Sequence, residues 1–130
     1  MLNNRSKPNP FEERELAISR LGGLEDLYNK HVECFKNNYN ECDVMLSQLI
    51  EENRYDEARV FAHSLKGLAS TLGMKDLHSK AKGIEISIKE GRFSDLPMLL
   101  SHFKTSLEQV IQSNGDDHSS SWDGTGLSGL

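Results

Sequence analysis

The spacing of apolar residues constrains the fold of this chain more than any other feature. Between residues 24 and 52 they recur every three or four positions for about four heptads, with no glycine or proline after Leu24. This period places side chains along one face of a helix, whereas a strand requires strict alternation, which occurs nowhere in the chain. We expect one long helix over residues 24–52, which could kink where asparagines weaken it. The apolar positions are Tyr28, Val32, Phe35, Tyr39, Cys42, Leu46 and Leu49, and the asparagines are Asn37, Asn38 and Asn40.

Four further segments show a helical pattern, and short turns separate them. Short turns make consecutive helices antiparallel neighbours, so we predict an all-α, up-down antiparallel four-helix bundle with a short extra N-terminal helix. The expected helices span residues 11–20, residues 56–72 with Asp56 as N-cap, residues 75–90, and the segment from Ser94 as N-cap to about residue 113, with Pro97 in its first turn. We expect a disordered leader over residues 1–10, the bundle over residues 11–113, and a flexible tail rich in Gly, Ser and Asp over residues 114–130.

Composition narrows the classes of partner. The 130-residue chain suits one domain, and its net charge of −5, without a run of five basic residues, argues against nucleic acid or an anionic membrane as partner. No apolar stretch approaches 18 residues, and the polar N-terminus does not look like a signal peptide. Cys34 and Cys42 would lie about 12 Å apart along a helix, too far for a disulfide. We therefore expect a cytoplasmic protein, and a self-contained bundle favours a monomer.

One histidine lies on the wrong side of its helix for a core residue. In the helix predicted over residues 56–72, Phe61, Leu65 and Leu72 share the inward stripe, and His63 lies about 200° from Phe61. His63 should therefore face water and be accessible to a partner. The residues expected around it are Arg59, Lys66, Gly67 and Ser70, at offsets of −4, +3, +4 and +7.

The surroundings of His63 favour a nucleophile over other roles. A general base needs an orienting carboxylate and a pocket, and we expect neither on the outer face of a bundle. A metal ligand needs companions, and the other histidines show no i, i+4 pairing and no cysteine-rich spacing. A neutral imidazole has a free lone pair that can accept a phosphoryl group, and Lys66 one turn along can reach its oxygens. No phosphate-binding loop or kinase motif is present, so the phosphoryl group must come from another protein.

The residues around His63 resemble a known family. Residues 62–73 read AHSLKGLASTLG, which closely matches the motif of the histidine-containing phosphotransfer (HPt) domain. Leu77, Ala81 and Ile84-Glu85 are similar to the second motif helix of the family, which usually has Leu-Glu at the last two positions. The resemblance covers about residues 11–112.

The resemblance implies a four-helix bundle that carries phosphate to or from the aspartate of a response-regulator receiver domain. His63 would be the phosphoacceptor through Nε2, Lys66 would stabilise the phosphoryl group, and Gly67 would give clearance. Arg59 and Ser70 would contribute to receiver docking. Any Mg²⁺ would belong to the receiver, so no cofactor or metal is expected here. The implied partners are receiver domains and a hybrid histidine kinase, and the chain itself would be a phosphocarrier and not an enzyme.

Three interpretations remain open from the sequence. The chain is a relay intermediate, either standing alone or excised from the C-terminal end of a hybrid sensor kinase. Alternatively, it is an adaptor bundle that docks receivers without phosphate turnover, although an adaptor could lose both His63 and Lys66. The third is a sensor-kinase histidine box, which usually has an acidic residue after the histidine and a proline soon after. Ser64 and Leu68 do not fit that pattern, but a chemotaxis-type phosphotransfer domain would look much like this chain.

Overall fold

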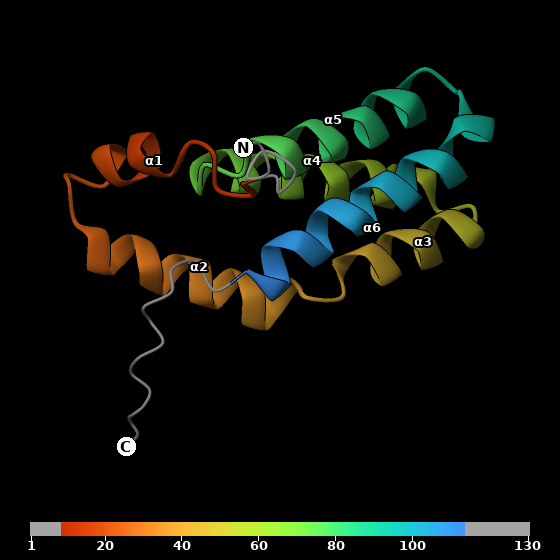
Figure 1. Cartoon of the computed structure of the whole chain (residues 1–130). Coiled ribbons are helices and arrows are strands. Elements are labelled where there is room, and N and C mark those ends of the chain that lie inside the picture. The colour runs from red at the N-terminus through yellow and green to blue at the C-terminus, as the bar shows by residue number, and fades with distance from the viewer. Residues whose placement is uncertain (1–8, 114–130) are drawn as a thin grey trace, which may run out of the picture.

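The computed structural model describes residues 9–113, and every regular element in that range is helical (Figure 1). The all-helical prediction is therefore confirmed for these residues, while residues 1–8 of the expected 1–10 leader and the expected tail over residues 114–130 lie outside them. The elements are α1 (Arg14–Arg20), α2 (Glu25–Tyr39), α3 (Cys42–Glu51), α4 (Tyr55–Thr71), α5 (Lys75–Lys89), the 3₁₀ turn η2 (Phe93–Asp95) and α6 (Leu96–Gln112). None of these helices combines the length and apolar character needed to cross a bilayer.

Helices α3 to α6 surround a common core. Helix α5 packs between α4 and α6, and α3 contacts both α4 and α6, which closes the ring of contacts. The core side chains come from the stripes that the three-four spacing predicts, because that spacing directs one face of each helix inward. Its largest fully buried members include Leu46, Leu65, Leu77, Ile84, Phe103 and Leu107.

The helix expected over residues 24–52 is in fact two helices. Helix α2 ends at Tyr39, and the backbone leaves the helical region at Glu41 (φ −122°, ψ 25°) before α3 begins at Cys42. Asparagine favours such a break because its side chain competes for backbone hydrogen bonds. Cys42 and Leu46 are nevertheless buried in the register that the pattern predicts. Apolar spacing continues through the break, so it could not reveal that the helix stops.

Three helix starts also differ from the prediction. Helix α1 begins at Arg14 and not at residue 11. Asp56 is not the N-cap of α4, because the helix begins one residue earlier and Arg54 occupies the cap position. Asp56 instead lies in the first turn, where a carboxylate interacts favourably with the helix dipole. Ser94 is not the N-cap of the last helix either. It lies within η2, and Asp95 takes the cap position before α6.

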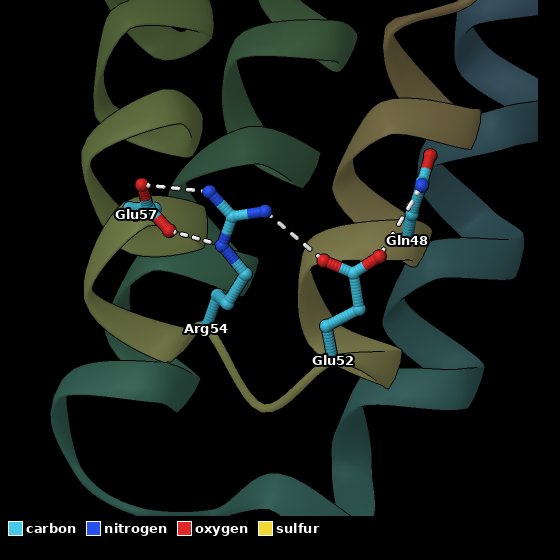
Figure 2. Close-up of polar contacts among 4 residues, drawn as sticks. All are labelled: Gln48, Glu52, Arg54 and Glu57. Carbon is cyan, nitrogen blue, oxygen red and sulfur yellow. Dashed lines mark hydrogen bonds and ion pairs between the residues drawn. The ribbon is translucent and has the colours of Figure 1, made fainter.

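Arg54 ties the end of α3 to the start of α4. Its guanidinium group donates to both carboxylate oxygens of Glu57 and to Glu52, whose other oxygen accepts from Gln48 (Figure 2). These bonds to Arg54 hold the pKa of both glutamates below the ordinary value. Because the cluster is exposed, its bonds add little stability. They fix the geometry of a tight turn, in which Asn53 has a positive φ of 60°.

The N-terminal segment is fastened to the end of α4. The Tyr28 hydroxyl donates to the Leu72 carbonyl at 2.8 Å, and the Glu13 amide donates to the Gly73 carbonyl at 2.9 Å. Tyr28 is 1% exposed, and this burial raises its pKa to about 12. Gly73 has a φ of +74°, and a Cβ there would lie 2.5 Å from the Glu13 carbonyl oxygen. Only glycine fits at this position, where the backbones of Gly73 and Glu13 come close together. This contact holds the N-terminal segment over the core.

Candidate functional site

His63 lies on the outer face of α4, and its side chain is 63% exposed. Ala62 and Leu65 on the inward side of the helix are fully buried, so the same helix that packs the core presents the imidazole to solvent. An exposed imidazole nitrogen is available to a group brought by another molecule.

A carboxylate from the neighbouring helix holds the imidazole. Glu85 on α5 places Oε2 2.8 Å from His63 Nδ1 and Oε1 2.9 Å from Lys66 Nζ. The side chain of Glu85 is only 9% exposed, which is unusual for a glutamate and requires partners of this kind. Glu85 therefore links the histidine and the lysine, whose side chains form no hydrogen bond with each other.

The ionisation of Glu85 fixes the tautomer of His63. The bond from Lys66 lowers the pKa of Glu85, burial opposes that effect, and the bond from His63 lowers it further, with a net pKa below the ordinary value. An ionised carboxylate can only accept hydrogen bonds, so Nδ1 must carry the proton. In the neutral ring Nε2 then has the free lone pair, and this is the nitrogen that a nucleophilic role requires.

Glu85 corrects the expectation that no carboxylate would orient a histidine on the outer face of a bundle. Helix α5 packs along α4 at this level and brings the carboxylate to the edge of the interface. A signal for it was present in the sequence, since Glu85 borders the inward stripe that contains Ala81, Ile84 and Ile88. A glutamate at the margin of a buried stripe needs a hydrogen-bond or ion-pair partner, because burial of an unpaired carboxylate is unfavourable. The sequence alone does not identify the residue that faces it.

Lys66 is partly buried, with 24% of its side chain exposed, and its ammonium group forms an ion pair with Glu85. It remains one helical turn from His63, within reach of a group attached to the imidazole. The Lys66 carbonyl accepts from Nδ1 of His78 on α5 at 3.1 Å. The lysine therefore lies on a stretch of α4 that bonds to α5 through both its side chain and its backbone.

Gly67 leaves a bare step on the surface beside His63. A Cβ at this position would meet no atom within 4 Å outside the local helix backbone, so the glycine is not required by packing. Ser70 is half-buried, and its carbonyl accepts from Arg20 of α1 at 3.3 Å. Arg59 is half-buried and forms no ion pair within residues 9–113. The structure thus joins the side chains of His63 and Lys66 through Glu85, whereas within residues 9–113 no side-chain hydrogen bond or ion pair joins Arg59 or Ser70 to His63.

The site has the groups for accepting an electrophile. Within residues 9–113, no group of three or more His, Cys, Asp and Glu side chains is placed to hold a metal ion. The histidine has an exposed lone pair, a carboxylate that balances positive charge on the ring, and a nearby ammonium group for an anion. These are the requirements for transfer of an anionic group onto nitrogen.

Most of the described part of the chain matches a known family. The model of a family described as the Hpt domain matches residues 31–113, which include His63, Lys66, Gly67 and Glu85. No curated protein and no solved structure matches the chain.

Proposed function

Because this chain belongs to the Hpt domain family, whose members act in histidine phosphotransfer and are phosphocarrier modules, we propose that it is a phosphorelay intermediate. In this proposal His63 accepts a phosphoryl group from the aspartyl phosphate of a receiver domain and passes it to, or takes it back from, a response-regulator receiver. The observation that carries the proposal is the exposed imidazole whose Nδ1 is bound by the buried Glu85 carboxylate.

The transfer step needs no base to remove a proton. The Nε2 lone pair attacks phosphorus, the bond from phosphorus to the aspartate oxygen breaks, and the carboxylate leaves with that electron pair. The ring keeps its Nδ1 proton and becomes a phosphorylated imidazolium. Glu85 stabilises this positive charge because its Oε2 already accepts the Nδ1–H bond at 2.8 Å. Return of the phosphoryl group to an aspartate reverses the same steps.

Lys66 and Gly67 have complementary roles in this proposal. The ammonium group of Lys66 would stabilise the equatorial phosphoryl oxygens, whose charge is the main electrostatic demand of such transfers. Its ion pair with Glu85 keeps it beside the imidazole before the phosphoryl group arrives. Gly67 would let the active site of the receiver close over His63, while Arg59 and Ser70 would lie at the rim of the contact.

The proposed assembly follows from the same assignment. Helices α3 to α6 would form the up-down antiparallel four-helix bundle, acting as a cytoplasmic monomer. The partners would be receiver domains and a hybrid histidine kinase, with no contact to nucleic acid or membrane. The Mg²⁺ would be supplied by the receiver, and the chain would have no cofactor and no kinase activity of its own.

The test is transfer from a phosphorylated receiver domain in the presence of Mg²⁺. We expect acid-labile, base-stable phosphate on the wild-type chain and none on His63→Gln, which lacks the acceptor nitrogen. Because His63 is exposed, its replacement leaves the core intact. His102→Gln, at an exposed position on α6, is the matched control and should transfer normally. Transfer that persists in His63→Gln would refute the assignment. Receiver binding without any transfer by the wild type would identify a docking-only adaptor.

A further inference from the structure

A row of lysines runs along α5 beside the site. Lys75, Lys82 and Lys89 are spaced seven residues apart, so they lie on one face of the helix with a drift of about 20° per step. All three lysines are exposed. At 1.5 Å per residue, the row spans about 21 Å of the helix surface.

The row adjoins the residues that hold His63. Lys82 precedes Glu85 by three positions and Lys89 follows it by four, and residues at these spacings are neighbours on a helix surface. Glu85 itself contacts His63 and Lys66 on α4, which packs alongside α5 (Figure 1). Arg59, one turn before His63, adds a further cation on α4. The lysine row is therefore continuous with the site and is not a separate patch.

Several carboxylates near this surface pair with other cations. Glu57 pairs with Arg54, Glu90 pairs with Arg92, and Glu85 pairs with Lys66. Lys80, on another face of α5, pairs with Asp76. Within residues 9–113, none of the lysines of the row forms an ion pair. A protein with a net charge of −5 thus presents a run of uncompensated positive charge next to His63.

We propose that the lysine row, together with Arg59, is a docking surface for the acidic face of the receiver domain that exchanges phosphate with His63. This inference rests on the proposed function and adds a surface beyond the imidazole and its immediate neighbours. The phosphoacceptor of the receiver in the proposed function is an aspartate, so an acidic face around it would be complementary in charge to the row. A typical interface buries about 800 Å² per partner and is roughly 30 Å across. An interface of this size centred near His63 would cover much of the row, which is about 21 Å long.

The row would act on the rate at which the two proteins meet. Charge complementarity raises association rates by roughly 10- to 1,000-fold, and salt removes the effect because the Debye length is only about 8 Å at physiological ionic strength. Chemistry at His63 would be unaffected, since neither Lys75 nor Lys82 forms a side-chain hydrogen bond or ion pair with His63 or Lys66.

The experiment compares two double variants that change the net charge equally. Lys75→Glu with Lys82→Glu reverses the charge at two of the three positions of the row, and Lys30→Glu with Lys104→Glu makes the same change at exposed positions on α2 and α6. The rate is measured as phosphotransfer from a receiver domain phosphorylated by acetyl phosphate and Mg²⁺, over a series of salt concentrations. We expect the row variant to lose about tenfold or more in the second-order rate constant at low salt, with a flattened salt dependence. The control variant should stay within about threefold of wild type.

Phosphoramidate, a small donor that requires no docking, separates docking from chemistry. It should phosphorylate His63 at similar rates in the wild type and both variants, and circular dichroism should show unchanged helicity. Equal slowing in both double variants, or no slowing in the row variant, would overturn the proposal. Loss of phosphoramidate labelling in the row variant would also overturn it, because the lysines would then act on the site itself. A wild type that accepts phosphate from phosphoramidate but from no receiver would instead refute the proposed function, and the docking surface with it.

Discussion

Gly67 gives a prediction in which stability and activity move in opposite directions. It lies in the middle of α4, where glycine is about 0.5–1 kcal/mol less favourable than alanine because of its backbone entropy. A Cβ at this position would meet no atom within 4 Å, so Gly67→Ala introduces no clash within the protein. We therefore expect Gly67→Ala to stabilise the fold by about 0.5–1 kcal/mol.

Urea unfolding followed by circular dichroism measures this change. With an m-value of about 1.5 kcal/mol/M, the midpoint should rise by roughly 0.3–0.7 M, with no change in slope. A midpoint that stays constant or falls would refute the reasoning, because it would mean that packing at Gly67 requires glycine.

Phosphotransfer from a receiver should respond in the opposite direction. The longer side chain of Gly67→Gln occupies the step beside His63 that the receiver must approach, and a penalty of about 1.4 kcal/mol in the transition state slows transfer tenfold. We expect a loss of about tenfold or more for Gly67→Gln, a smaller loss for Gly67→Ala, and none for Ser101→Gln on an exposed part of α6. Unchanged transfer in Gly67→Gln would show that the bare step is irrelevant to docking.

Two further predictions concern the core and the buried carboxylate. Leu65→Ala should destabilise the protein by about 2–5 kcal/mol, because Leu65 is 0% exposed and its loss leaves a cavity; a urea melt showing less than 1 kcal/mol would contradict this. The pKa of Glu85 is held below its ordinary value of 4.5, so its ionised form stabilises the fold above that pH, and the contribution is lost as the pH falls through the depressed pKa. The stability difference between wild type and Glu85→Gln should thus persist from pH 7 down to about pH 5 and shrink at lower pH. A difference that already shrinks near pH 6, or that persists at pH 2, would contradict the assigned ionisation.

The sequence predicted the helical class and most of the core because both depend on one local pattern. Leu46, Leu65, Leu77 and Phe103 are buried as their spacing requires. The break at Glu41 was outside the reach of that pattern, since the apolar register continues through it. Helix starts such as Arg54 were missed because the observed cap positions form no side-chain capping bonds, which are the feature that sequence rules recognise.

The candidate site was partly accessible to sequence reasoning. The exposure of His63 follows from its angle on α4, and that angle is a property of a single helix. The carboxylate of Glu85 was missed because its contact with His63 spans 22 positions and depends on how α4 and α5 align. Sequence periodicity gives the face on which a residue lies, but it does not give the residue opposite on the next helix.

The fastening of the N-terminal segment has a consequence for recombining this domain with others. The family match begins at residue 31, yet Phe11, Ala17 and Tyr28 are buried, and Tyr28 satisfies the carbonyl at the end of the histidine-bearing helix. A chimera joined at residue 31 would expose that carbonyl and the apolar surface beneath α1. The unit that can be exchanged intact therefore begins before Phe11. The segment that matches the family, residues 31–113, is shorter than the segment that a chimera must keep together.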